Sequence, residues 1–391
     1  MNMKRLKQIV VKLNLMNILS VFFYIFRVFP IQKNKIIFVN YHGKGYGDGG
    51  KYIAEQLLDK DVKIYWAVKN MNSCLPSCIK KVKINSISYF FHLSTSKVWV
   101  NNSRFPQYIR KRKKQYYIQI WHGCLALKKV EFDAYDKMTE YYKKWMVRDT
   151  KMTNLMVSNS DFCTDMYRRA FKYNGEILNV GTPRNDILIN YEKSINSKVR
   201  TYYNISENDN ILVYAPTFRL DYSTKPYDID FEKIKRVLET ATNRKWKILI
   251  RLHPIIKNPK EHIKNMNNYI NATDYPDMQE LIISCDILMT DYSSTMFESM
   301  IANKKVILYT KDLNDYKNER GTYFNIKDLP FISASNNNEL IKEVKEIDKF
   351  DYTKKYNAFK EKIGLNETGK SSEIVANRIL EIINGDYDGK E

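Results

Sequence analysis

Short apolar strands alternate with amphipathic helices along most of this chain, and this alternation limits the folds that it can adopt. Buried strands are predicted at residues 35–40, 63–68, 97–102, 116–121 and 154–160, and a strand that enters a loop at 177–186. Residues 49–60, between the first two strands, show the apolar spacing of a helix. Because parallel strands are joined by helical crossovers, this pattern predicts a parallel sheet with helices on both faces.

The same alternation resumes after a polar stretch, predicted to be a linker, at residues 190–208. Further strands are predicted at 210–218, 245–254, 285–294 and 304–310, with helices at 231–241 and 294–303. A chain of 391 residues is too long for one small core. We therefore predict an α/β protein with two Rossmann-like domains, residues 31–190 and 191–391, and a ligand site in the cleft at the carboxyl ends of their strands.

Residues 1–30 differ in composition from the rest of the chain, since they combine cations with aromatic side chains. Positions 4, 5, 7 and 12 are Lys or Arg, and aromatic residues gather at positions 22–26. Polar residues interrupt the apolar pattern, so a clean membrane-spanning stretch of about 20 residues is missing from this segment. The pattern is typical of an amphipathic helix that lies on an anionic membrane surface. The alternative is a helix packed on the protein's own surface.

The overall charge favours anionic partners. The net charge is +20 and the isoelectric point is about 9.4, and such a field attracts nucleic acid, anionic lipid or a phosphorylated substrate. The basic run at 108–117 is short and precedes a buried strand, which favours a solvated or membrane-facing edge over a nucleic-acid site. Five cysteines without a CxxC pair favour ordinary thiols over a metal or redox site.

A histidine stands at the end of one predicted strand, in the sequence Trp121–His122–Gly123. A lone histidine is usually structural. Here Gly123 removes side-chain bulk beside the ring, and two lysines follow a few residues later. A neutral imidazole at a strand end can remove a proton from a hydroxyl group. His122 is therefore a candidate general base.

Polar residues follow three strands of the second unit. "YAPTFR" ends one strand with Thr217 and Arg219, "RLHP" ends another with His253, and "TDYSST" leads from a third into a helix. An arginine holds phosphate with a planar fork of donors, and a helix start capped by Ser293, Ser294 and Thr295 favours an anion. Together they predict a diphosphate cradle without a metal. The nearby Asp291 is expected to orient a loop or a histidine.

The glycine-rich stretch at 43–50 contains the spacing of a dinucleotide-binding loop. Such a site also needs an acidic residue at the end of the next strand, and that strand ends in Lys69 and Asn70. The loop can still approach an anion closely, and a plain flexible loop is equally consistent with it. We therefore expect neither a dinucleotide nor any other cofactor, and no metal.

Five motifs occur in order: "IQIWHGCLALKK" (118–129), "VGTPRND" (180–186), "VYAPTFR" (213–219), "RLHP" (251–254) and "TDYSSTMFE" (290–298). Together they resemble the CDP-glycerol glycerophosphotransferase family of teichoic-acid and capsule synthesis. The resemblance implies a two-domain arrangement of the GT-B glycosyltransferase type. It also implies transfer of a polyol phosphate from a CDP-activated donor to a hydroxyl of a lipid-linked acceptor, at the cytoplasmic face of the membrane.

The resemblance also assigns residues. It implies that His122 and His253, the family's two motif histidines, are catalytic, that Arg219 is its arginine, and that Ser293 and Ser294 bind phosphate. Gly123, Thr217, Asp291 and Thr295 are further expected substrate-binding positions. Relatives commonly have Thr–Pro where Cys124 and Leu125 stand here, which suggests that these two residues affect acceptor or polyol preference.

Several alternatives stay open at this point. A ribitol-phosphate transferase of the same family, or a GT-B enzyme that uses a nucleotide sugar, would share the fold. The latter usually has a glutamate-rich motif in its second half, where this chain offers only Glu298. A basic lipid- or nucleic-acid-binding protein without catalysis would not need two histidines at strand ends. The identity of the polyol and acceptor and the oligomeric state do not follow from the sequence.

Overall fold

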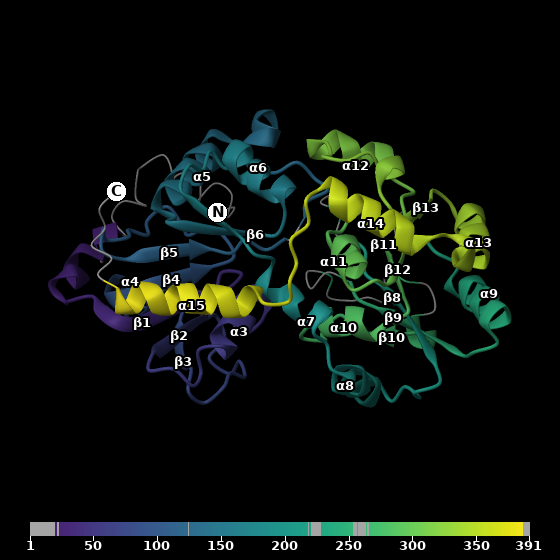
Figure 1. The fold of residues 1–391 in the computed structure, drawn as a ribbon, viewed down its shortest axis with the longest axis horizontal. Helices are drawn as coiled ribbons and strands as arrows, with labels where there is room; N and C mark the ends of the chain where they lie inside the picture. Colours follow the sequence, from purple (N-terminus) through teal and green to yellow (C-terminus); the bar gives the residue numbers. More distant parts are fainter. Residues whose placement is uncertain are drawn as a thin grey trace, which may run out of the picture.

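Two parallel sheets form the framework of the computed structural model (Figure 1). It describes residues 20–385 except 22, 124, 218, 220–227, 253–255, 257–262 and 264–265. Two residues of the predicted site region, Cys124 and His253, therefore lie outside the described residues, as does most of the predicted amphipathic segment 1–30.

The first sheet has the strand order β3-β2-β1-β4-β5-β6-β7, and every pairing is parallel. Its strands are β1 (Gln32–Val39), β2 (Lys63–Val68), β3 (Lys80–Lys83), β4 (Ser96–Asn101), β5 (Tyr116–Gln119), β6 (Leu155–Ser158) and β7 (Glu176–Asn179). All six strands predicted for this region are present. The short edge strand β3 was not predicted, because only one of its four residues is buried and apolar.

The second sheet has the order β10-β9-β8-β11-β12-β13, again with parallel pairings. Its strands are β8 (Asn210–Tyr214), β9 (Trp246–Ile250), β10 (Ile270–Asn271), β11 (Ile287–Thr290), β12 (Lys305–Tyr309) and β13 (Ile332–Ala334). In both sheets the first three strands run outward in order, and the fourth then pairs with the other side of the first strand. This is the topology of doubly wound folds, where ligands bind at the carboxyl ends of the strands. We call the parts around the two sheets the first and second halves.

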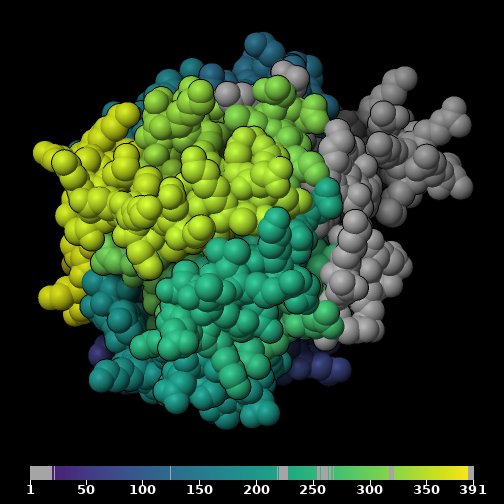
Figure 2. Space-filling model, turned by 90° about the vertical axis from the view of Figure 1, so that its right-hand side faces the viewer, coloured from purple at the N-terminus to yellow at the C-terminus, as the bar shows by residue number. Residues whose placement is uncertain are grey.

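Helices cover both sheets. The α-helices are α3 (Asp48–Glu55), α4 (Ile87–Thr95), α5 (Glu140–Met152), α6 (Asp161–Ala170), α7 (Asp186–Ile189), α8 (Lys193–Tyr203), α9 (Phe231–Thr242), α10 (Met278–Ser284), α11 (Thr295–Ile301), α12 (Leu313–Arg320), α13 (Asn337–Lys345), α14 (Tyr352–Lys362) and α15 (Ser371–Asn384). The 3-10 helices are η1 (Phe26–Val28), η2 (Glu131–Lys137), η3 (Pro183–Asn185), η6 (Met266–Asn268), η7 (Ile326–Asp328) and η8 (Ile347–Lys349). Figure 2 shows the outer face of the second half, where α13 packs on α9.

One of these helices corrects the prediction of a linker at 190–208. Helix α8 occupies most of that stretch, and its Val199 is fully buried. Lysines, an arginine and tyrosines fill much of the helix, so the few apolar residues that contact the core, Val199 and the partly buried Ile195 and Tyr203, were hidden in a polar sequence. The two halves are therefore joined through a packed helix.

The last helix returns to the first half. After α14, the chain crosses over and α15, drawn in yellow, lies along the first sheet (Figure 1). Val375, Ala376 and Ile379 are buried in the same apolar cluster as β1 and β4 residues such as Ile36 and Val98. The range 191–391, predicted as the second domain, thus contributes one helix to the core of the first half.

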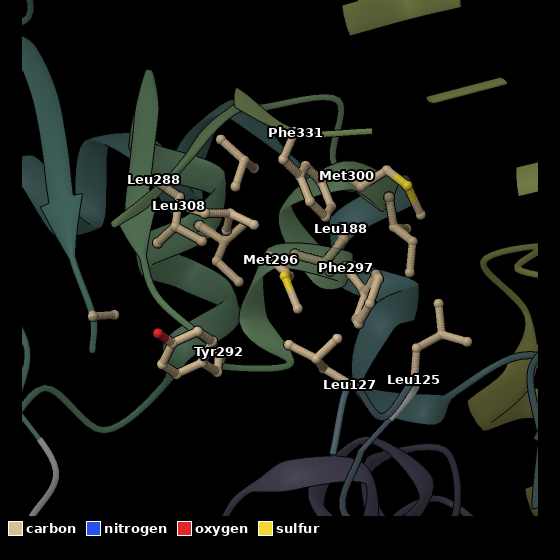
Figure 3. Packing of buried hydrophobic residues seen from close by; sticks show 14 of the residues in the cluster. Leu125, Leu127, Leu188, Leu288, Tyr292, Met296, Phe297, Met300, Leu308 and Phe331 are labelled. Carbon is tan, nitrogen blue, oxygen red and sulfur yellow. The ribbon is translucent and has the colours of Figure 1, made fainter. Parts of the chain in front are cut away.

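A shared apolar core joins the halves beneath the predicted site. Leu125 and Leu127, which follow His122, are each 1% exposed and belong to a cluster with Met296 and Phe297 of α11. Figure 3 shows these leucines directed toward the α11 side chains. The segment after His122 is therefore anchored in the second half. Leu125 is buried in the core, so the predicted effect of this residue on acceptor or polyol preference would act through the shape of the segment that follows His122.

The described end of the N-terminal segment packs on the first half. Phe23 is fully buried and makes an edge contact with Phe90 of α4, with ring centroids 5.3 Å apart. The side chains of Val21, Ile25 and Val28 are 52%, 54% and 79% exposed. This part therefore has one buried and one solvent-facing apolar side. Among the residues that the structure describes, none of the helices combines the length and apolar character needed to cross a bilayer.

Candidate active site between the two sheets

A cavity of about 250 Å³ lies between the halves. Its walls include Tyr41, Asp48, His122 and Arg184 from the first half and Arg251, Asp277, Gln279, Ser294, Thr295 and Glu298 from the second. Most of these residues follow strands or begin helices at the carboxyl ends of the strands. The cavity is therefore where the doubly wound topology places a ligand.

His122 enters this cavity with a defined tautomer. Its Nδ1 atom lies 2.8 Å from the backbone oxygen of Asn102. A carbonyl oxygen only accepts hydrogen bonds, so in the neutral ring Nδ1 carries the proton and Nε2 carries the lone pair. This arrangement equips Nε2 to accept a proton.

The surroundings of His122 favour the neutral ring. The residue is exposed to solvent at the cavity, but the surrounding protein partly desolvates the imidazole, and this desolvation lowers its pKa below the usual value. The hydrogen bond to Asn102 and the charge of Asp48 oppose the shift, and the charge of Arg184 adds to it. The net result is a base that is uncharged at neutral pH.

The backbone beside the histidine is strained. Trp121 has a φ of 49°, in the left-handed region that bulky residues avoid. Its amide donates to Gln119 Oε1 at 2.9 Å, and its ring lies 4.2 Å from that of His122. Strain of this kind costs about 1–3 kcal/mol and persists where the surrounding structure enforces it. Here it turns the chain sharply at the end of β5 and directs His122 into the cavity.

A chain of polar contacts holds Asn102, the partner of His122. The Asn102 side chain is fully buried, donates from Nδ2 to Asp48 Oδ2 and accepts from the Tyr41 amide at 2.8 Å. Asp48 pairs in turn with Arg184, whose Nη1 lies 2.8 Å from Asp48 Oδ1 and 2.9 Å from the His122 carbonyl oxygen. Burial alone would raise the pKa of Asp48, but Arg184 and Asn102 hold it below its usual value.

Arg184 also connects the halves. Its Nε and Nη2 atoms donate to Glu298 Oε1, the first at 3.1 Å, and Gln279 Nε2 donates to Glu298 Oε2 at 3.0 Å. Burial raises the pKa of Glu298, and Arg184 opposes that rise. A second connection joins Asp277 Oδ2 to Tyr52 at 2.8 Å and to Lys51 at 3.1 Å. The geometry of the cavity is thus set by charges from both halves.

Arg251 is the cation of the second half that faces the cavity. Its Nη1 donates to the Tyr275 carbonyl oxygen at 2.6 Å, and it forms no ion pair with any described residue. Burial lowers its pKa, with partial opposition from Asp277. A desolvated guanidinium that keeps donors free is suited to bind phosphate oxygens.

Arg219, by contrast, points into a buried carboxylate cluster. Its Nε lies 2.6 Å from Asp312 Oδ2 and its Nη2 lies 2.7 Å from Asp291 Oδ2. Thr217 donates to Asp291 Oδ1 from its amide at 2.9 Å and from its hydroxyl at 2.6 Å. Arg219 and Asp291 are only 4% and 1% exposed. This cluster ties the loop after β8 to the loop after β11.

The three hydroxyl residues after β11 lie beside this cluster. Thr295 begins α11, and its hydroxyl and amide donate to Ser293 Oγ at 3.0 and 3.4 Å. Ser294 and Thr295 line the cavity. The cluster of Thr217, Arg219 and Asp291 therefore positions the backbone that presents these two hydroxyl groups.

The structure brings together part of the predicted site. His122, Ser294 and Thr295 share the cavity, and a methyl group added at Gly123, next to His122, would meet open space. Thr217, Arg219, Asp291 and Ser293 form the supporting layer behind it. His253 lies outside the described residues.

Sequence reasoning did not assign four charged residues of the site to this function, although each stands in or next to a motif, and it named Glu298 only for the nucleotide-sugar alternative. Asp277, a further charged wall residue, stands in no motif. Arg251 precedes His253 in "RLHP", Arg184 lies in "VGTPRND", Asp48 lies in the glycine-rich stretch and Glu298 ends "TDYSSTMFE". A charged residue within a motif at a strand end was the available signal. Their partners could not be inferred, because Arg184 contacts residues 136 and 114 positions away.

Comparison with known proteins identifies the family of this chain. A profile of the family described as CDP-Glycerol:Poly(glycerophosphate) glycerophosphotransferase matches residues 21–381. A teichoic acid poly(glycerol phosphate) polymerase from Staphylococcus epidermidis is 32% identical over 366 residues, which are 89% of this chain and 51% of that protein. A teichoic acid glycerol-phosphate transferase from Staphylococcus aureus is 30% identical over 370 residues, 89% of this chain and 93% of that protein.

A solved structure shares the fold over nearly the whole chain. It is the wall teichoic acid polymerase TagF, as a histidine variant soaked with CDPG, with a TM-score of 0.82, 29% identity and 97% of both chains covered. The present chain spans about half the length of the S. epidermidis relative. The predicted α/β fold with parallel sheets and the predicted family are confirmed. This chain belongs to the CDP-glycerol:poly(glycerophosphate) glycerophosphotransferase family.

Proposed function

We propose that this protein transfers a polyol phosphate, foremost glycerol phosphate, from a CDP-activated donor to a hydroxyl of a lipid-linked glycan or polymer acceptor, and releases CMP. The reaction would serve teichoic-acid or capsule synthesis. One observation carries the proposal beyond family membership: His122 and Arg251 line the same cavity from opposite halves. A base thus lies opposite a cation that has no carboxylate partner among the described residues. Transfer from a diphosphate requires a proton acceptor near the attacking hydroxyl and positive charge near the phosphates.

In the proposed reaction, Nε2 of His122 removes the proton from the acceptor hydroxyl. The oxygen attacks the β-phosphorus of the donor, which carries the polyol. A new P–O bond forms, the bond from this phosphorus to the bridging oxygen breaks, and CMP leaves with that oxygen. The hydrogen bond from Nδ1 to Asn102 keeps the ring in the tautomer that this step needs.

The second half would hold the diphosphate. Arg251 offers N–H donors, and Ser294 and Thr295 offer hydroxyl groups at the same cavity. His253, two residues after Arg251 in the sequence, is proposed to complete this side. Transfer of a phosphoryl group depends chiefly on such positioning and charge stabilisation. No cofactor is part of the proposal.

Thr217, Arg219 and Asp291 would act through the loops that they hold. Arg219 already donates to two carboxylates and to the Thr217 carbonyl oxygen. Direct binding of phosphate by Arg219 would require it to share these donors. We therefore propose Arg219 as a positioning residue for the segment of Ser293, Ser294 and Thr295. The two halves would form the GT-B-type arrangement that the sequence resemblance implies.

The contacts of Glu298 speak against a nucleotide-sugar enzyme. In that alternative, a glutamate at this point of the second half would bind the sugar. Here Glu298 is 2% exposed and its carboxylate oxygens accept from Arg184 and Gln279. Its role is to connect the two halves.

An assay with a panel of donors tests the function. The protein is incubated with CDP-glycerol, CDP-ribitol and a nucleotide sugar, each with lipid-linked glycan or polymer acceptors. We expect CMP release with CDP-glycerol and a product heavier by one or more glycerol phosphate units. Turnover of CDP-ribitol alone would move the proposal to ribitol phosphate. Consumption of the nucleotide sugar alone, or no turnover while acidic polymers bind, would refute it.

Attachment to the cytoplasmic face of the membrane is part of the same proposal, because a lipid-linked acceptor lies at a bilayer. Support comes from the exposed apolar side chains of residues 21–29, which include Tyr24 at 53% and Phe29 at 46% exposure. Arginines flank them: Arg27 lies over the Tyr24 ring and Arg112 donates to the Phe29 carbonyl oxygen at 2.8 Å. Apolar groups beside cations suit an anionic membrane surface.

Point substitutions test the membrane proposal better than deletion, since Phe23 belongs to the core. Ile25→Asp and Val28→Asp should weaken sedimentation with anionic vesicles, whereas Tyr202→Asp, at an equally exposed position on α8, should not. Equal vesicle binding by all variants would rule out this surface as the attachment site.

A further inference from the structure

A groove lies between η2 and α5 of the first half, lined by residues distinct from those around the cavity of His122. Its volume is about 580 Å³. Four of its lining residues are cations, Lys143, Lys144, Arg148 and Lys151, and among the described residues none of the lining side chains is acidic. Phe132 and Tyr135 form an aromatic wall, with stacked rings 5.5 Å apart. A concave surface with this composition is suited to an anionic ligand that has apolar parts.

Arg148 gives the strongest indication of such a ligand. It is half-buried, and it makes no hydrogen bond or ion pair with any residue that the structure describes. Its Nε atom is buried without a partner, and burial lowers its pKa. The charge of Arg110 is close enough to interact with it. Desolvating a guanidinium without a counter-charge is costly, and an anion in the groove would offset that cost.

The lysines continue this charge along one face of α5. Lys144 and Arg148 are four residues apart and Lys151 follows three later, so the three side chains share a helix face. They cover about 10 Å along the helix axis, at 1.5 Å per residue. Like charges at this spacing destabilise a helix, so the stripe has a cost in the free protein. Among the described residues, Lys144 and Lys151 form no ion pair.

The groove is directly connected to the candidate base. Glu131 begins η2 and is close enough for its charge to act on His122, and Tyr135 lines the groove four residues later. Glu131 is held by Arg104 at 2.8 Å and by Tyr142 of α5 at 2.9 Å. These bonds fix η2 against α5. The groove therefore lies on the same half as the base, and η2 links the two: Glu131 at its start acts on His122, and Tyr135 further along lines the groove.

We propose that this groove binds the phosphodiester chain of the acceptor and directs its terminal hydroxyl toward His122. This inference rests on the proposed function and adds a binding site for the acceptor's phosphates. Several cations in a row fit the repeated charges of a polyol-phosphate chain, and the aromatic wall fits its carbon units. A bilayer surface is the weaker occupant, because Arg148 lies inside a concave groove that a flat surface does not enter.

Binding of a short synthetic glycerol-phosphate oligomer without a lipid tests the proposal. The variants are Arg148→Gln and the double variant Lys144→Gln/Lys151→Gln, whose positions are exposed enough to spare folding. The control is Lys193→Gln/Lys345→Gln, which removes two exposed lysines on α8 and α13. Affinity is measured by calorimetry at several salt concentrations, with vesicle sedimentation as a second measurement. In turnover assays, KM for the acceptor is compared with KM for CDP-glycerol.

We expect each groove variant to weaken oligomer binding about tenfold or more, as the loss of a charge-assisted bond does, with a shallower salt dependence. KM should rise for the acceptor and stay near wild type for the donor. Unchanged oligomer affinity in both groove variants would overturn the proposal, as would a loss confined to vesicle binding. If no CDP-polyol is turned over, the proposed function fails, but the oligomer titration still decides whether the groove binds such a chain.

Discussion

The Nδ1 atom of His122 lies 2.8 Å from the backbone oxygen of Asn102, and the Asn102 side chain is held by Asp48 and by the amide of Tyr41. All four residues belong to the first half. The tautomer and direction of the proposed base are therefore set before a donor binds. Arg184 extends this arrangement to Glu298 in the second half, so one arginine contributes both to the contact between the halves and to the network that orients the base.

Replacing His122 should reduce turnover without removing donor binding. General-base catalysis contributes about 100- to 10,000-fold, so His122→Gln should lower kcat by that order. The proposed donor contacts come from the second half, so the affinity for CDP-glycerol should change little. Single-turnover kinetics and calorimetry measure the two effects separately. Turnover close to wild type would show that another group accepts the proton.

The pH dependence should report the same residue. In the proposed reaction the neutral imidazole is the active form. The value of kcat/KM should therefore fall as pH drops through the His122 pKa, which desolvation places below the usual value of about 6.5. The charge of Asp48 raises that pKa, so Asp48→Asn should move the acid limb to lower pH. Asp59→Asn, at a residue with a 73% exposed side chain, should leave the limb in place. If Asp48→Asn, like Asp59→Asn, leaves the acid limb at the wild-type pH, the limb does not report the His122 pKa.

Arg184 should matter for stability as well as for activity. Arg184→Met leaves Asp48 and Glu298 buried without their cation, which typically costs about 3–5 kcal/mol. The matched control is Arg169→Met, which breaks the more exposed pair with Asp133 and should cost about 1 kcal/mol or less. Urea unfolding of the two variants gives the comparison. Equal losses would mean that the Arg184 contacts do not stabilise the fold as described.

Replacing Arg251 should affect the use of the donor and leave the use of the acceptor unchanged. Arg251→Gln removes a charge-assisted contact worth about 1.5–3 kcal/mol, so KM for CDP-glycerol should rise about 10- to 100-fold. Arg251→Lys should restore only part of the effect, because lysine lacks the planar fork. Arg236→Gln, an exposed site on α9, serves as control. A rise in KM for the acceptor alone would exclude the donor role.

Lys35 offers a test of stability away from the site. It is 1% exposed, and burial, helped by Lys63 and Lys80, lowers its pKa from 10.5 to about 8. Between these values the unfolded chain binds more protons, so stability should rise with pH from about 8 to 10.5. Lys35→Met should remove this rise and stabilise the protein at pH 7 by up to about 3 kcal/mol. Lys245→Met, at an exposed position, should do neither in the same denaturation series.

The sequence by itself determined the parallel α/β framework and part of the site. The alternating apolar pattern located ten of the strands. Because the carboxyl ends of parallel strands lie at one edge of a sheet, His122, Ser294 and Thr295 were expected to line one cleft, and they do. Each of these inferences depends on local patterns. Periodicity and turn chemistry carry that information because they act over a few residues.

Only the tertiary structure decided what surrounds these side chains. Arg219 forms ion pairs with Asp291 and Asp312, so Arg251 is the arginine of the second half that lines the cavity among the described residues. Leu125 is buried in the core. Arg184 joins Asp48 and Glu298, which lie more than a hundred positions away along the chain. A charged side chain has the same local pattern whether it meets a carboxylate or a ligand. Its role depends on burial and on partners brought together by folding, which no local pattern records.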